Sequence, residues 1–133
     1  MKFPRELLTL ETTPGSFAIC RGPTNAPLPE AFFSGDFVCV TKTKDELSVV
    51  CEESRSPPNF ARELGWSLLK VRGPLDFGLV GILSSLTEPL SEAGLSVFAV
   101  STYETDYLLL RQERLAEAVA ALRDAGFTVH EAS

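Results

Sequence analysis

The stretch LSVFAVSTYETDYLLLRQERLAEAVAAL, residues 95–122, carries the pattern that decides the fold. Residues 95–101 and 106–111 are short apolar runs typical of strands, and the connection between them is rich in turn-forming residues. From residue 113 onward the apolar spacing changes to that of a helix. The residues that form its buried stripe are Leu115, Val119 and Leu122. The stretch therefore predicts two paired strands followed by an amphipathic helix.

The flanking residues extend this pattern in both directions. Residues 66–72, WSLLKVR, predict a strand, and residues 82–93 predict an amphipathic helix that ends before Gly94. Residues 127–130, FTVH, predict the last strand. The resulting order, strand-helix-strand-strand-helix-strand, is the split βαβ or ferredoxin-like pattern. We expect two helices on one face of a four-stranded antiparallel sheet.

The first half of the chain carries a weaker version of the same pattern. Residues 6–12 and 16–21 predict strands, and Pro14-Gly15 between them predicts a hairpin turn. Residues 37–43 and 47–52 predict a second strand pair. A short helix is expected at residues 60–64, closed by Gly65.

An internal repeat is suggested by the apolar pattern. Sliding the first half along the chain to pair Val40 with Val100 also pairs Leu47 with Tyr107, and the apolar pattern is kept. This echo indicates a degenerate duplication that has lost its long helix. We therefore predict an α+β fold of two ferredoxin-like (βαββαβ) units in tandem, with helices on one face of antiparallel sheets. The degenerate unit is expected at 1–64 and the regular one at 65–133.

Composition narrows the classes of function. The chain has 133 residues, 44% of them hydrophobic and 23% charged, with a net charge of −6. Without clustered Lys and Arg, a nucleic-acid partner is not expected. The three cysteines, with no signal peptide, indicate a reducing compartment, and no run is long enough to span a membrane. We expect a cytoplasmic protein that is not attached to a membrane.

Catalytic and metal-binding motifs are not found. The sequence has no nucleophile elbow, zincin motif, phosphate-binding loop or dinucleotide fingerprint. The single histidine, His130, has no partner at the spacing of metal ligands. We therefore expect no catalytic residues, no metal and no cofactor.

Two segments carry possible binding chemistry. Residues 72–81 place Gly and Pro at a strand-to-helix turn, where accessible backbone amides suit an anion such as a carboxylate. An ordinary turn explains the same residues equally well. Residues 101–106 gather hydroxyl and carboxylate groups, with Asp106 as a candidate acceptor for an ammonium group. Ser, Thr and Asp are also common turn formers, and taken alone this second explanation is the stronger one.

The run STYETDYLLLRQERL, residues 101–115, resembles a signature of ACT domains, in the branch of tandem-ACT proteins that includes the CASTOR arginine sensors. The upstream run FVCVTKTKDELSVVCEE, residues 37–53, resembles the stretch that precedes it there. The resemblance implies small ligands, usually amino acids, bound at interfaces between ACT units. Carried over to this chain, the implied loop residues are Asp76, Phe77, Gly78, Leu79 and Val80. The implied signature residues are Asp106, with Ser101, Thr102 and Thr105 beside it.

These observations predict a regulatory module that is not an enzyme. It is expected to bind a small molecule, most simply an amino acid, and to act on an unidentified partner protein. A homodimer is expected, because two chains restore the four ACT units that the arginine sensors carry in one chain. The alternative is a structural or interaction module that dimerises through its ACT units and binds no ligand.

Overall fold

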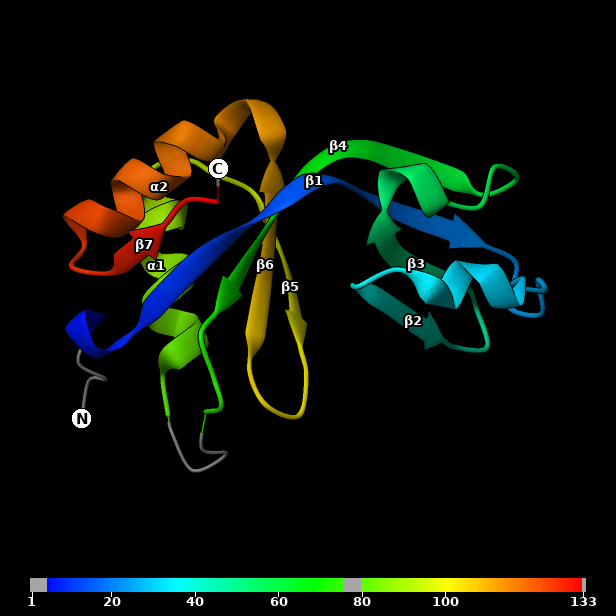
Figure 1. The fold of residues 1–133 in the computed structure, drawn as a ribbon, viewed down its shortest axis with the longest axis horizontal. Coiled ribbons are helices and arrows are strands. Elements are labelled where there is room, and N and C mark those ends of the chain that lie inside the picture. The colour runs from blue at the N-terminus through cyan, green and yellow to red at the C-terminus, as the bar shows by residue number, and fades with distance from the viewer. Residues whose placement is uncertain (1–4, 76–79, 133) are drawn as a thin grey trace. The chain divides into compact units, whose positions relative to one another are not determined.

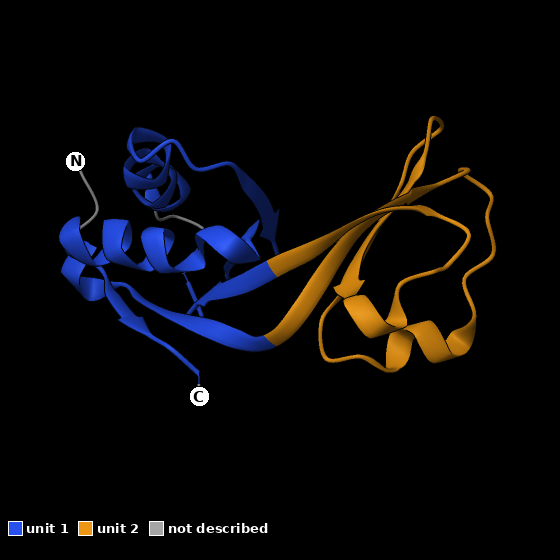
Figure 2. Ribbon diagram, turned by 90° about the horizontal axis from the view of Figure 1, so that it is seen from above, with its two compact units in different colours: residues 1–14, 67–133 blue, residues 15–66 orange. Residues whose placement is uncertain are grey.

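The computed structural model describes residues 5–75 and 80–132 of the chain. They form two compact units, which Figure 2 distinguishes by colour. Unit 1 contains residues 1–14 and 67–133, and unit 2 contains residues 15–66. The division between the units falls after Trp66, and the segment 1–14 belongs with the second half of the chain.

Unit 1 contains the strand-and-helix order expected for the second half of the chain (Figure 1). Its elements are the unit 1 part of β4 (Ala61–Val71), α1 (Ile82–Glu92), β5 (Val97–Ser101), β6 (Asp106–Arg111), α2 (Leu115–Asp124) and β7 (Thr128–His130). A 3-10 turn, η4 (Gln112–Arg114), joins β6 to α2. The left-handed backbone of Gly94 and Gly126 follows the two helices, as glycine at these positions predicts.

The sheet of unit 1 contains one strand more than expected. Strand β1 (Thr9–Gly22) begins in unit 1 and lies between β7 and β4, so the strand order is β7-β1-β4-β6-β5. It pairs with β7 in parallel, with Leu10 opposite Val129. Leu8 and Leu10 are buried in the same core as the helix residues Leu86 and Leu122. Burial of these two leucines explains why the N-terminal segment joins this sheet.

Two local expectations for the first half are wrong. Pro14-Gly15 is not a hairpin turn, because β1 runs through it as one continuous strand. Residues 60–64 are not a helix, because β4 already begins at Ala61. Both glycines do have the left-handed backbone that turn chemistry favours, with φ of 98° at Gly15 and 80° at Gly65. Strand pairing on either side keeps the chain extended despite that conformation.

Unit 2 has a smaller core and no long helix among its residues. Strand β2 (Val38–Lys42) pairs with β3 (Leu47–Glu52), which in turn pairs with β1 from Phe17 to Gly22. The remaining elements are the 3-10 helix η2 (Glu30–Ser34) and the 3-10 turn η3 (Glu53–Arg55). Phe32 of η2 packs on a cluster of buried strand residues: Ala18, Cys20, Leu47, Val49 and Cys51.

The duplication is visible in the strand register, displaced by a single position from the alignment expected from the sequence. The pair Val38↔Cys51 matches Val97↔Leu110, and the pair Lys42↔Leu47 matches Ser101↔Asp106. The turns η3 and η4 occupy matching positions in the same alignment. The displacement matters, because side chains alternate between the faces of a strand. The chain is thus an α+β pair of ferredoxin-like units, with the first degenerate.

Candidate functional site

A pocket in unit 1 lies where the beginning of α1 meets the connection between β5 and β6. Its volume is about 290 Å³. The described residues that line it are Leu75, Gly81, Ile82, Leu83 and the run from Ser101 to Asp106. The two segments singled out in the sequence therefore contribute to one pocket.

The connection between β5 and β6 is a tight turn held by Thr102. Its backbone N–H donates to the carbonyl oxygen of Thr105 at 2.8 Å, and its hydroxyl donates to the same oxygen at 3.1 Å. The N–H of Thr105 donates back to the Thr102 hydroxyl at 3.3 Å. Thr102 is thus occupied in closing the turn.

Unit 2 contains the same turn at the matching position of the repeat. Thr43 donates its N–H to the carbonyl oxygen of Glu46 at 2.9 Å, and its hydroxyl accepts the N–H of Glu46 at 3.1 Å. The threonine that closes the turn is therefore a shared structural feature of both units. The strand residues that flank it differ, since Lys42 and Leu47 stand where unit 1 has Ser101 and Asp106. Because unit 2 forms the same turn with other residues at these two positions, Ser101 and Asp106 are not required to form the turn.

Ser101 and Asp106 face each other across the ends of β5 and β6. They form the last pair of the ladder, and the Ser101 hydroxyl donates to Oδ1 of Asp106 at 2.6 Å. This hydrogen bond fixes the carboxylate at the edge of the pocket. Ser101 is exposed, Asp106 is half-buried, and both line the pocket.

The wall of the pocket is held to strand β4 by Thr105. This residue is only 5% exposed, and its hydroxyl donates to the carbonyl oxygen of Val71 at 2.6 Å. The N–H of Leu75 donates to the carbonyl oxygen of Glu104 at 2.7 Å. Gly73 leaves room for this approach, because a Cβ there would lie 3.1 Å from that same oxygen. The structure gives Thr105 an anchoring position beneath the pocket.

Helix α1 begins at the pocket with its positive dipole end. Gly81 occupies the N-cap position with φ of 85°, and no side-chain hydrogen bond caps the helix there. The first N–H groups of a helix lack intrahelical partners, so at Ile82 and Leu83 they are suited to an anion. No acidic residue lies in the first turn of this described helix to compete for them.

The remaining loop residues implied by the resemblance are only partly placed. Asp76, Phe77, Gly78 and Leu79 lie outside the described residues. Val80 is described; it is 78% exposed and is not among the residues lining the pocket. The resemblance did not name six residues that line the pocket: Leu75, Gly81, Ile82, Leu83, Tyr103 and Glu104. Four of them lie within the two segments singled out in the sequence, and Ile82 and Leu83 directly follow the first segment.

The described ranges, 5–75 and 80–132, contain no cluster of three or more His, Cys, Asp or Glu side chains suited to a metal ion. No helix in this part of the chain combines the length and the apolar character needed to cross a membrane.

Comparison with known families matches both halves of the chain. Residues 62–124 match the family model described as an ACT domain. This segment of the chain is an ACT domain. Residues 15–59 match a second family model, which describes an N-terminal domain. This ACT domain spans most of unit 1 and contains all the described residues of the pocket.

Two relatives are informative. A protein from Agobacterium tumefaciens with a known crystal structure is 36% identical in sequence to this chain. The two structures match with a TM-score of 0.87, over 95% of this chain and 94% of that one. The cytosolic arginine sensor for mTORC1 subunit 1 from Bos taurus is 29% identical over 97 residues. That alignment covers 65% of this chain and 30% of the bovine protein, so this ACT protein matches less than a third of its relative's length.

The regulatory subunit of aspartate kinase from Thermus thermophilus shares the fold. Its TM-score is 0.56 at 10% identity, over 87% of this chain and 93% of that one. ACT domains are regulatory modules that bind small molecules. The match thus indicates that residues 62–124 form a regulatory module.

Proposed function

We propose that this ACT protein is an amino-acid sensor that binds its ligand in the pocket between α1 and the β5–β6 connection. The observation that carries the proposal is the presence of both a helix N-terminus and the Asp106 carboxylate in one pocket of about 290 Å³. An amino acid carries an anionic and a cationic group on one carbon atom. A pocket with opposite charge preferences at its two sides complements both groups.

The ligand carboxylate lies at the N-terminus of α1. The backbone N–H groups of Ile82 and Leu83 donate to its oxygens, and the helix dipole adds favourable electrostatic energy of about 0.3 to 1 kcal/mol. The absence of a side chain at Gly81 leaves this end of the helix open to the ligand.

The ligand ammonium lies at Asp106. Ser101 holds Oδ1 of this carboxylate, so Oδ2 is the oxygen that we assign to the ligand. A charge-assisted hydrogen bond of this kind is about twice as strong as a neutral one. Leu47 at the matching position of unit 2 has no such oxygen, so the ligand binds to unit 1 only.

Arginine is the first ligand to test. Glu104 and Asp106 line the pocket, and no Lys or Arg is among the described residues that do so. An acidic lining favours a basic side chain. The bovine relative is named as an arginine sensor.

Isothermal titration calorimetry of the full chain with each proteinogenic amino acid tests the proposal. One amino acid is expected to bind selectively, and at 100 times its Kd to stabilise the protein by about 2.7 kcal/mol. Asp106→Asn is expected to lose binding, whereas Asp124→Asn, which changes an exposed carboxylate at the end of α2, keeps it. Equal binding by parent and Asp106→Asn would overturn the assignment.

The wider assignment has three parts: the protein forms a homodimer, it is cytoplasmic, and it acts through an unidentified partner protein. The bovine relative is named as a cytosolic sensor, which supports the second part. Light scattering after gel filtration tests the dimer.

A ligand-free interaction module is the competing candidate. It is favoured by the exposure of Val80 (78%) and Tyr103 (82%), because large exposed side chains of this kind suit protein contacts. It predicts a dimer that no amino acid stabilises.

A further inference from the structure

Unit 2 contains a larger cavity than the one just described. Its volume is about 400 Å³, within the range of small-molecule sites. It lies between the segment around η2 and the segment from Ser54 to Phe60. Most of its walls are apolar and come from Pro27, Pro29, Phe32, Pro57, Pro58 and Phe60.

The repeat explains why this cavity exists. In unit 1 the turn η4 leads directly into α2, whose residues Ala118, Val119 and Leu122 fill the core. In unit 2 the matching turn η3 leads instead into Pro57-Pro58 and then into β4. Without the helix, the side chains that would fill this side of the core are missing. The prolines in its walls have fixed φ angles, which restricts the backbone conformations around the cavity.

The same comparison identifies an arginine that has lost its bidentate carboxylate partner. In unit 1, Arg114 donates two hydrogen bonds to Glu117 of α2, at 2.7 Å and 3.0 Å. In the alignment of the two units Arg55 matches Arg114, whereas Pro58 stands at the position that matches Glu117. Arg55 lines the cavity and carries the one charge among its described lining residues.

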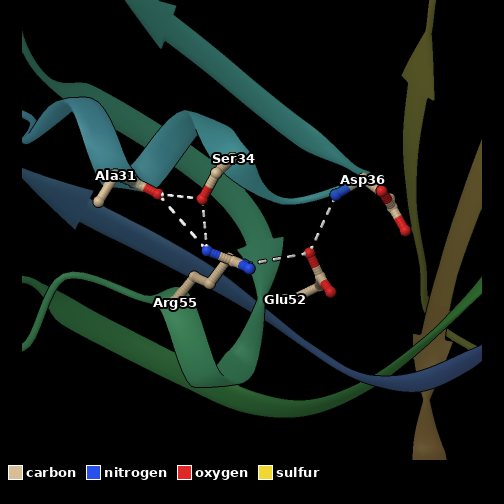
Figure 3. A network of polar contacts seen from close by, with 5 residues as sticks. All are labelled: Ala31, Ser34, Asp36, Glu52 and Arg55. Carbon is tan, nitrogen blue, oxygen red and sulfur yellow. Dashed lines mark hydrogen bonds and ion pairs between the residues drawn. The ribbon is translucent and has the colours of Figure 1, made fainter.

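The Arg55 guanidinium is held in place by contacts that do not reproduce that bidentate pair (Figure 3). Its Nη1 donates to the Ser34 hydroxyl at 2.6 Å and to the carbonyl oxygen of Ala31 at 3.5 Å. Its Nε forms an ion pair with Oε2 of Glu52 at 3.6 Å, and that oxygen also accepts the N–H of Asp36 at 3.1 Å. The cation is oriented, but its carboxylate contact is long.

We propose that the cavity of unit 2 binds a small carboxylic acid with an apolar body, whose carboxylate accepts a hydrogen bond from the Arg55 guanidinium. The proline and phenylalanine walls take the apolar body. Charge-assisted hydrogen bonds between guanidinium and carboxylate groups are about twice as strong as neutral ones. This site is separate from the amino-acid pocket and does not depend on the function proposed for it.

Titration of the isotopically labelled full chain with phenylacetate, followed by NMR, tests the proposal, with phenylacetamide as the uncharged probe of the same shape. Saturable shifts are expected in residues 27–32 and 54–60, and the amide is expected to bind about tenfold more weakly. Arg55→Gln should abolish the difference between acid and amide. Arg21→Gln, which removes an exposed arginine of the same unit, should preserve it.

Ala31→Phe provides a second test that keeps Arg55, because the larger side chain fills part of the cavity. It is expected to block both probes, and circular dichroism confirms that the variant is folded. Asp106→Asn should bind phenylacetate like the parent, which separates this site from the amino-acid pocket. Equal affinity for acid and amide in the parent, an Arg55→Gln variant that still prefers the acid, or no saturable shifts would overturn the proposal.

Discussion

The hydroxyl of Thr105 donates a 2.6 Å hydrogen bond to the carbonyl oxygen of Val71, and both residues are buried. This bond joins the β5–β6 connection to the end of β4. We expect Thr105→Val, which keeps the shape and removes the donor, to lower the free energy of unfolding by about 1 to 3 kcal/mol. Thr105→Ser keeps the hydroxyl and should lose less. Urea denaturation measures both, and equal losses would mean that the hydrogen bond contributes little.

Gly22 and Phe60 are in close contact in unit 2. A Cβ at Gly22 would lie 2.6 Å from the Phe60 ring, which packs against the core and lines the cavity. We expect Gly22→Ala to lower the free energy of unfolding by about 1 to 3 kcal/mol, because the ring has to move. Adding Phe60→Leu should recover part of this loss, and a double-mutant cycle measures the coupling. Additive effects would contradict the steric explanation.

The cysteines differ in their chemical environment. Hydrogen bonding with Cys51 lowers the pKa of the Cys20 thiol, and the same bond together with burial raises the pKa of Cys51. Both side chains are at most 2% exposed, whereas Cys39 is half-buried. We expect accessibility to outweigh pKa, so that Cys39 reacts first with a thiol reagent in the folded protein. Mass spectrometry of the labelled protein identifies the site, with Cys39→Ser as the control. Faster labelling of Cys20 would show that its pKa dominates.

Arg114 and Glu117 form an exposed pair whose effect depends on pH. Hydrogen bonds from Arg114 lower the pKa of Glu117 in the folded state. The stabilisation is therefore complete above the unfolded pKa of about 4.3 and is lost as the pH falls through the folded pKa. The difference in Tm between the parent and Glu117→Gln should be small at neutral pH, shrink in acid and decrease with added salt. A difference that grows as the pH falls would contradict this sign.

The local sequence pattern was sufficient to predict most of the strands and helices. Residues 47–52 and 106–111 are strands with the predicted bounds, and α1 begins at Ile82 as predicted. Apolar periodicity determines these elements because each buries one face within its own unit. The same information predicted the ferredoxin-like arrangement, whereas the family was predicted from the resemblance of residues 101–115 and 37–53 to ACT-domain motifs.

Predictions from the local sequence were wrong where pairing with distant strands determines the backbone conformation. Pro14-Gly15 and residues 60–65 have the composition of a turn and of a helix end, but the first lies within β1 and almost all of the second within β4. Pairing of β1 with β7 and β3 keeps the first of these extended. A pattern confined to a few residues carries no information about such partners.

For the site, the sequence by itself named Ser101 and Asp106 as candidates, and the tertiary structure placed them in the same pocket as the beginning of α1. Only the tertiary structure distinguished them from Thr102, because the repeated turn in unit 2 uses the equivalent Thr43 without a matching carboxylate. Only the tertiary structure disclosed the second cavity as well. A cavity forms where no residue fills the core, and the absence of a helix after η3 in unit 2 leaves Arg55 beside that empty volume.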